Sequence, residues 1–243
     1  MSQLDLACAA QISTRHLSCL ETGRAHPSRE MLLRLAERLA VPLRERNQLL
    51  LAGGFAPMYR ERALDDPALA PARQALQLVL NGHEPYPAIA VDRHWNLVAM
   101  NRAAPVLLEG AAPELLVPPV NVLRVALDPR GVAPRIVNLP EVRHHLLSRL
   151  EQQVIASGDE TLGRLCAELQ QLGQAHPPPT VDYGGVLVPL KLRSPAGELS
   201  FFSTLTVFGS PLDITLAELA VEAFFPADEF TAEVLRRAAA SHG

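Results

Sequence analysis

The first 28 residues constrain the fold most strongly, because their apolar side chains recur with helical spacing on both sides of a short break. Leu4, Leu6 and Ala7 form the apolar face of a first helix, and a break follows at 11–13. Ser13, at the end of that break, can cap a second helix, since its hydroxyl can accept an unpaired backbone N–H. The pattern therefore predicts two short helices joined by a tight turn.

The second of these helices has an apolar side and a polar side. Leu17 and Leu20 face inward at i, i+3 spacing, and Gly23 follows where a helix end favours positive φ. A polar second helix behind a tight turn is the arrangement by which helix-turn-helix proteins reach base edges in the DNA major groove. The sequence therefore predicts a recognition helix over residues 14–21.

Candidate DNA contacts come from this helix and the residues that flank it. An arginine in its first turn can bind a guanine edge with two hydrogen bonds, or a phosphate. The alternative for Thr14, Arg15 and His16 is that they form a solvated helix face. Cys19 borders the same face, and the alternative for it is a small buried side chain that fills space in the core. Glu21 is expected to connect the helices. The predicted DNA-binding set is Gln3, Thr14, Arg15, His16, Ser18, Cys19, Thr22 and Arg24.

Charge is unevenly distributed along a chain whose net formal charge is −4. Residues 1–62 contain nine arginines and six acidic residues, which leaves +3, so the remainder carries −7. A mildly basic N-terminal segment is compatible with phosphate contacts made by a few arginines and helix N-termini.

Further helices complete a first, all-α domain at residues 1–54. Ser28 is expected to cap a helix at 29–40, and Pro42 to open another that ends at Gly53 and Gly54. Residues 55–66 are predicted to be a linker. A helix at 67–81 then begins the second domain, which extends over residues 67–243.

The second domain mixes strands with helices. Two short strands flank a predicted turn at 92–96, helices follow at 141–155 and 162–172, and a hairpin joins strands at 186–192 and 198–208. Residues 216–226 fit a helix by composition and a strand by alternation; we favour the strand, because it extends the hairpin. A last helix is expected at 231–240. This order predicts an α+β, PAS-like domain with about five antiparallel strands.

Apolar side chains in these strands could line a ligand cavity, because small-molecule sites are mostly apolar with few polar groups. A filled core is the alternative for each of them, and the sequence does not decide which face of 198–208 meets a cavity. Arg135, Asn138 and Arg143 are candidate anchors for an acidic ligand, with a surface or capping role as the alternative. The predicted apolar and neutral lining is Val91, Trp95, Leu97, Met100, Phe201, Phe202, Thr204 and Phe208.

Other functional classes lack support in the sequence. Three scattered cysteines without CxxC spacing argue against a disulfide framework or a zinc site, and fit a cytoplasmic protein. No apolar run approaches the length of a membrane span, and no signal segment begins the chain. Adjacent histidines at 144–145 point about 100° apart, so they would not share a metal. Neither a catalytic motif nor a cofactor motif occurs, so no cofactor or enzymatic activity is expected.

Two families resemble the chain. Residues 2–28 are similar to the helix-turn-helix of XRE (Cro/C1-type) regulators, through Gln3, Ala7, Glu21, Gly23 and Pro27. The second domain resembles the ligand-binding domain of MmyB-like regulators, and the resemblance implies a cavity for fatty-acid-like molecules. Members usually carry another Arg- and Leu-rich helix before residue 2, so the first helix of the DNA-binding domain is expected to be missing, through either a misplaced start codon or a real truncation. The segments that carry the second resemblance are 84–104, 134–150, 197–219 and 222–228.

The sequence thus predicts a dimeric transcription regulator that binds a two-fold symmetric DNA operator and senses a small apolar ligand. One alternative is a ligand-binding sensor that no longer binds DNA, because a helix is missing from its first domain. Another is an enzyme that converts a lipid-like substrate in the cavity. Turnover that survives loss of residues 1–62 would favour the enzyme.

Overall fold

The computed structural model describes residues 2–172, 188–208 and 213–241, and the chain divides into two compact units. The first unit comprises Met1–Leu69 and Phe208–Glu218, and the second comprises Ala70–Val207 and Leu219–Gly243. The predicted fold class is confirmed: helices come first, and a five-stranded antiparallel sheet with helices follows in the described part of the chain.

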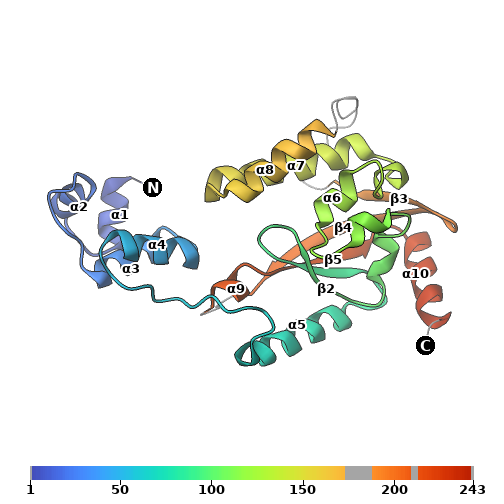
Figure 1. Cartoon of the computed structure of the whole chain (residues 1–243), viewed down its shortest axis with the longest axis horizontal. Coiled ribbons are helices and arrows are strands. Elements are labelled where there is room, and N and C mark those ends of the chain that lie inside the picture. Colours follow the sequence, from blue (N-terminus) through green and yellow to red (C-terminus); the bar gives the residue numbers. More distant parts are fainter. Residues whose placement is uncertain (1, 173–187, 209–212, 242–243) are drawn as a thin grey trace. The chain divides into compact units, whose positions relative to one another are not determined.

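The first unit begins with short helices (Figure 1), and a serine caps the start of each of the first three. Ser13 accepts a hydrogen bond from the His16 amide at 3.1 Å, and Ser28 accepts one from the Met31 amide at 3.2 Å, as predicted. Gly23 follows the second helix with a φ of 71°, also as predicted. These helices are α1 (Gln3–Ala9), α2 (Thr14–Glu21), α3 (Arg29–Arg38) and α4 (Leu43–Ala52).

A small apolar core holds these helices together. Ala7, Leu17 and Leu50 are almost fully buried, and the Arg34 side chain donates a hydrogen bond to the Ala10 carbonyl oxygen at 3.2 Å. Leu4, which the periodicity places on the apolar face of α1, is 61 % exposed. It lies one turn before Ala7, in the first turn of α1, where the described residues leave most of its side chain uncovered. The prediction that Leu4 faces the core is therefore wrong.

Residues 55–66, predicted as a linker, are bound to other parts of the first unit. Asn47 on α4 donates to the Tyr59 carbonyl at 2.7 Å, and the Arg62 guanidinium pairs with Asp213 at 2.8 Å. The Ile214 amide donates to the Arg60 carbonyl, also at 2.8 Å. The sequence did not predict that residues 208–218, between two strands of the second unit, belong to the first. Short helices here are η1 (Pro67–Leu69) and α9 (Ile214–Ala217).

The second unit is built on an antiparallel sheet with the strand order β2-β1-β5-β4-β3. The longest ladder joins β4 to β5, from Phe201 opposite Pro226 to Val207 opposite Ala220. β5 is the central strand, since β1 pairs with its other edge. The strands are β1 (Ala88–Val91), β2 (Leu97–Met100), β3 (Leu190–Ser194), β4 (Gly197–Val207) and β5 (Ala220–Pro226).

Helices cover both faces of this sheet. In Figure 1, α6, α7 and α8 lie over one face, and α5 lies against the other. α7 and α8 pack together as a helical pair over the strands. The α-helices are α5 (Ala70–Gly82), α6 (Val122–Leu127), α7 (Leu139–Ser157), α8 (Glu160–Gln171) and α10 (Glu229–Ser241), and the short 3₁₀ helices are η2 (Ala104–Leu107), η3 (Pro113–Leu116) and η4 (Ala133–Arg135).

Two predicted elements differ from the structure. In the segment 216–226, α9 ends at Ala217 before β5 begins, so the favoured strand is wrong for its first residues. Asp213 caps α9 by accepting from the Thr215 amide at 3.0 Å, which lets the helix-favouring residues form one turn. The predicted hairpin strand at 186–192 lies partly outside the described residues, and β3 begins at Leu190.

Buried Asn101 joins α5, β1 and η2 through its side chain. Its carbonyl oxygen accepts from the Ala88 amide at 3.0 Å and from the Ala104 amide at 3.1 Å. Its amide nitrogen donates to the Leu80 carbonyl at 3.2 Å and to the Tyr86 carbonyl at 2.8 Å. Asn101 is only 3 % exposed, so water cannot replace these bonds easily.

We predict that Asn101→Ala lowers the free energy of unfolding by about 3 kcal/mol, because it leaves several buried backbone groups without partners. Urea titration followed by fluorescence of Trp95, the single tryptophan of the chain, measures this change. Asn81→Ala, on the exposed side of α5, is the matched control and should cost less than about 1 kcal/mol. Equal unfolding midpoints for the two variants would contradict this role of Asn101.

Candidate nucleic-acid interface and ligand cavity

Helix α2 exposes a polar surface over its first turns. The Thr14 and Arg15 side chains are exposed, and His16, Ser18 and Cys19 are half-buried. Leu17, on the opposite side of the helix, is 2 % exposed and fixes the rotation of α2 against the core. The predicted contact residues on α2 therefore lie where another molecule can reach them.

The residues that flank this surface differ in how far they are engaged. Gln3 donates a hydrogen bond from its side-chain amide to the Glu21 carboxylate at 2.6 Å, which ties α1 to the end of α2. The Thr22 hydroxyl donates to the Ser18 carbonyl at 2.7 Å, and Arg24 is exposed. Glu21 has the structural role expected of it, and Gln3 keeps its side-chain oxygen available for a donor.

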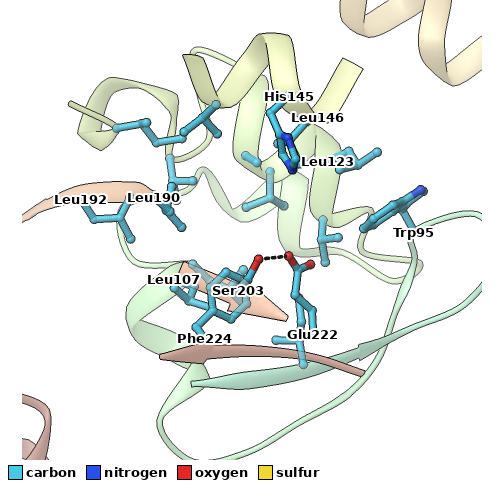
Figure 2. A pocket seen from close by; sticks show the side chains of 18 of the residues that line it. Trp95, Leu107, Leu123, His145, Leu146, Leu190, Leu192, Ser203, Glu222 and Phe224 are labelled. Atoms are coloured by element: carbon cyan, nitrogen blue, oxygen red, sulfur yellow. Dashed lines mark hydrogen bonds between the residues drawn. The ribbon is translucent and has the colours of Figure 1, made fainter. Parts of the chain in front are cut away.

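A cavity of about 120 Å³ lies in the second unit, between the sheet and helices α6 and α7 (Figure 2). Most of the lining is aliphatic or aromatic. Trp95 stands at one side, held by a 2.8 Å hydrogen bond from its indole N–H to Gln153 on α7. Its lining includes Trp95, Leu97, Leu123, His145, Ser203, Glu222 and Phe224.

A polar pair interrupts the apolar floor of this cavity. The Ser203 hydroxyl on β4 donates to the Glu222 carboxyl group on β5 at 2.8 Å, as drawn in Figure 2. Leu205 lies directly opposite Glu222, and Ser203 directly opposite Phe224, so the two polar residues are diagonal neighbours on one face. That face of β4, which the sequence left undecided, is therefore the one that meets the cavity.

Burial favours the uncharged form of the Glu222 carboxyl group. Glu222 is 8 % exposed, and burial raises the pKa of its carboxyl group above the ordinary value of 4.5, although Ser203 and Arg149 act in the opposite direction. His145 is largely exposed and lies at the rim, where partial burial and the nearby Arg149 and His144 lower its pKa. Both shifts favour neutral side chains.

The structure distributes the predicted lining residues over several environments. Trp95 and Leu97 line the cavity, whereas Val91 and Phe201 are buried in the core beside it. Met100 is 40 % exposed. The remaining three are elsewhere: Phe202 stacks on Phe225 with ring centroids 5.1 Å apart, Thr204 is exposed, and Phe208 belongs to the first unit.

The three candidate anchors for an acidic ligand hold the protein's own backbone. The Arg135 guanidinium donates to the Arg193 carbonyl at 2.9 Å, and the Asn138 amide donates to the Pro189 carbonyl at 2.7 Å. Arg143 donates to the carbonyls of Leu169 and Gln170. Backbone carbonyl groups therefore use several of these donors. The buried Nη2 atom of Arg135 makes no hydrogen bond to a described residue and lies 3.4 Å from a carboxylate oxygen of Glu109. The anchoring role of these residues stays a prediction.

Sequence reasoning did not single out Ser203 and Glu222. The available signal was an isolated acidic residue within the apolar strand sequence AVEAFFP, because a lone charge in a buried strand needs a partner or a function. His145 was considered only as a metal ligand. Its position at a cavity rim depends on how α7 packs, which a single sequence does not show.

The described residues contain no group of three His, Cys, Asp or Glu side chains that could hold a metal ion. None of the described helices combines the length and apolar character that a bilayer crossing needs. Cys8, Cys19 and Cys166 are free thiols.

Family models match both parts of the chain. The model described as MmyB-like transcription regulator ligand binding domain matches residues 72–238, and the model described as helix-turn-helix matches residues 1–46. No curated protein is similar enough to count as a relative. A solved structure of an RNA-binding Light-Oxygen-Voltage receptor matches at 14 % identity with a TM-score of 0.28, over 99 % of this chain. The chain spans 62 % of that structure, and so low a score carries no argument.

We predict that the stability of wild-type protein falls relative to Glu222→Gln as the pH rises from about 5 to 8. The folded-state pKa of Glu222 is raised, so its contribution is complete below the unfolded pKa and is lost as the pH rises through the folded pKa. Glutamine keeps the acceptor for Ser203 and cannot ionise. Urea unfolding at each pH, followed by Trp95 fluorescence, measures the difference.

The matched control for this comparison is Glu198→Gln, which removes an exposed carboxylate from the same sheet. Its stability relative to the wild type should stay constant over the same range. A constant difference for Glu222→Gln as well would show that Glu222 ionises as readily in the folded chain as in the unfolded one.

Proposed function

The chain belongs to the family of MmyB-like transcription regulators, and on this basis we propose that α2 reads a DNA operator while the cavity senses a small apolar ligand. The observation that carries the proposal is the rotation of α2, which buries Leu17 and exposes Thr14 and Arg15. The chain binds its ligand and does not convert it.

Arg15 is the proposed base reader. It lies in the first turn of α2, and its exposed guanidinium can donate two parallel hydrogen bonds to the O6 and N7 atoms of a guanine. Thr14, His16, Ser18 and Cys19 share this surface and supply further contacts in the groove. Gln3, Thr22 and Arg24 lie at its margins, where they contact phosphates and fix the register of the protein on the duplex.

We propose that two copies bind together, since a pair of recognition helices reads a two-fold symmetric operator. Their half-sites would then be about 34 Å apart, one turn of the duplex. Dimerisation also doubles the phosphate contacts, which matters for an N-terminal segment with only a small excess of arginine.

The proposed ligand has the aliphatic body of a fatty-acid-like molecule. Leu123, Leu97 and Phe224 offer it apolar contacts, and Trp95 offers a flat wall. An engineered cavity of about 150 Å³ in another protein holds benzene, so a cavity of about 120 Å³ suits a segment of similar size. A longer chain has to displace part of the lining.

Residues 213–218 provide a route from the cavity to the DNA-binding helices. Glu222 is in the cavity wall, and Glu218, four residues earlier, accepts hydrogen bonds from Arg44 on α4 at 2.7 Å and 3.0 Å. Arg44 also binds Glu61 at 2.8 Å. A ligand that shifts the start of β5 would therefore change the carboxylate that holds α4. Such coupling requires that the ligand bind one arrangement more tightly than the other.

We predict that Arg15→Ala weakens binding to the true operator by about 1–3 kcal/mol, or roughly five-fold to 150-fold, if Arg15 reads a base. Arg38→Ala, at the exposed end of α3, removes the same charge and should reduce affinity far less and equally for all sequences. Electrophoretic shift titrations at one fixed salt concentration compare the two. Equal losses for both variants would remove Arg15 from base recognition.

A further inference from the structure

The cavity has a specific place for one polar atom of a ligand. Glu222 is on the central strand of the sheet, with Ile89 opposite it on β1 and Leu205 opposite it on β4. Ser203 donates to its Oε1 atom, and Oε2 has no hydrogen bond to any residue that the structure describes. An apolar lining surrounds this unused oxygen. A ligand that enters the cavity can therefore satisfy Oε2.

The charged groups near this point decide which polar atom fits. His145 at the rim and Arg149, both on α7, are the basic side chains that face Glu222. The Arg149 guanidinium lies over the Trp95 ring, 4.6 Å from its centroid, and it is outside the cavity lining. Within the described lining, neither an arginine nor a lysine is available to neutralise an anionic ligand.

We propose that the cavity takes an uncharged aliphatic molecule whose hydroxyl, carbonyl or amide oxygen binds the Ser203–Glu222 pair, and that it rejects ionised carboxylates. This inference rests on the proposed sensing function and specifies the ligand of the same cavity. The ligand resembles a fatty acid in its chain and differs from it in its polar end.

A neutral carboxyl group gives this selectivity a simple basis. With its proton on Oε2, Glu222 donates to the ligand oxygen, while Ser203 Oγ can accept a hydrogen bond from a ligand hydroxyl. An ionised carboxylate ligand would lose its hydration in an apolar cavity and meet neither an arginine nor a lysine among the described lining residues, and a buried charge without such a partner is costly. A cationic amine could bind only by forcing Glu222 to ionise.

Three probes of equal chain length separate these chemistries: hexan-1-ol, hexanoate and hexylamine. Trp95 is the single tryptophan and lines the cavity, so its fluorescence in the full-length protein reports occupancy, with calorimetry as an independent measurement. We expect hexan-1-ol to bind at least about 30-fold more tightly than hexanoate at neutral pH. Hexylamine should also bind more weakly than the alcohol.

Variants at Glu222 test the contact itself. Glu222→Gln keeps an uncharged hydrogen-bonding group and should hold hexan-1-ol within about three-fold of the wild type, whereas Glu222→Leu should weaken it by about five-fold or more. Glu198→Gln, on the exposed part of β4, should change nothing. A folded Glu222→Leu variant that binds the alcohol as well as the wild type overturns the contact.

The remaining outcomes separate this inference from the proposed function. Hexanoate binding as tightly as hexan-1-ol overturns the neutral-ligand claim and leaves ligand sensing intact. Tighter binding of hexylamine overturns it in favour of an ionised Glu222. If none of the three probes binds, the cavity does not take a ligand of this size, and both claims fail for the second unit. None of these results bears on the proposal that α2 binds an operator, because that proposal is tested by a separate measurement.

Discussion

The antiparallel ladder between β4 and β5 is the interaction on which the rest of the second unit depends. It pairs residues from Phe201 opposite Pro226 to Val207 opposite Ala220. This register places Ser203 and Glu222 on the cavity face and stacks Phe202 on Phe225 on the other face. A slip of one residue would exchange the two faces and put the phenyl rings where the polar pair now lies.

This ladder ends at Val207 and Ala220, and the chain segment between them belongs mainly to the first unit. The connection between β4 and β5 carries Asp213 and Glu218, and these acids bind Arg62 and Arg44. A cavity wall and a set of DNA-binding helices therefore share one short stretch of chain. Because ion pairs of partly exposed side chains contribute little stability, their value here is positional: they hold Asp213 beside Arg62 and Glu218 beside α4 within the first unit.

Local patterns in the sequence were enough to predict the helix ends of the first unit and the order of elements in the second. Ser13, Ser28 and Gly23 act through bonds and dihedral angles close to them in the chain, so their roles follow from nearby residues. The cavity could not be predicted in this way. Glu222 meets Ser203 across strands 19 residues apart in sequence, and Arg135 is turned to backbone carbonyls by loops whose path a single sequence does not reveal. Long-range register and packing decide such contacts.

The measurement that tests the central claim most directly is the affinity of hexan-1-ol for the full chain, read from Trp95 fluorescence with and without saturating operator DNA. Coupling between two sites is reciprocal, so the account predicts that the operator changes the alcohol affinity by about five-fold or more. Glu218→Gln, which removes one of the two charged partners of Arg44 and leaves Glu61, should bring the two affinities together. Identical alcohol affinities with and without DNA in the wild type would contradict the claim that the cavity governs the DNA-binding helices.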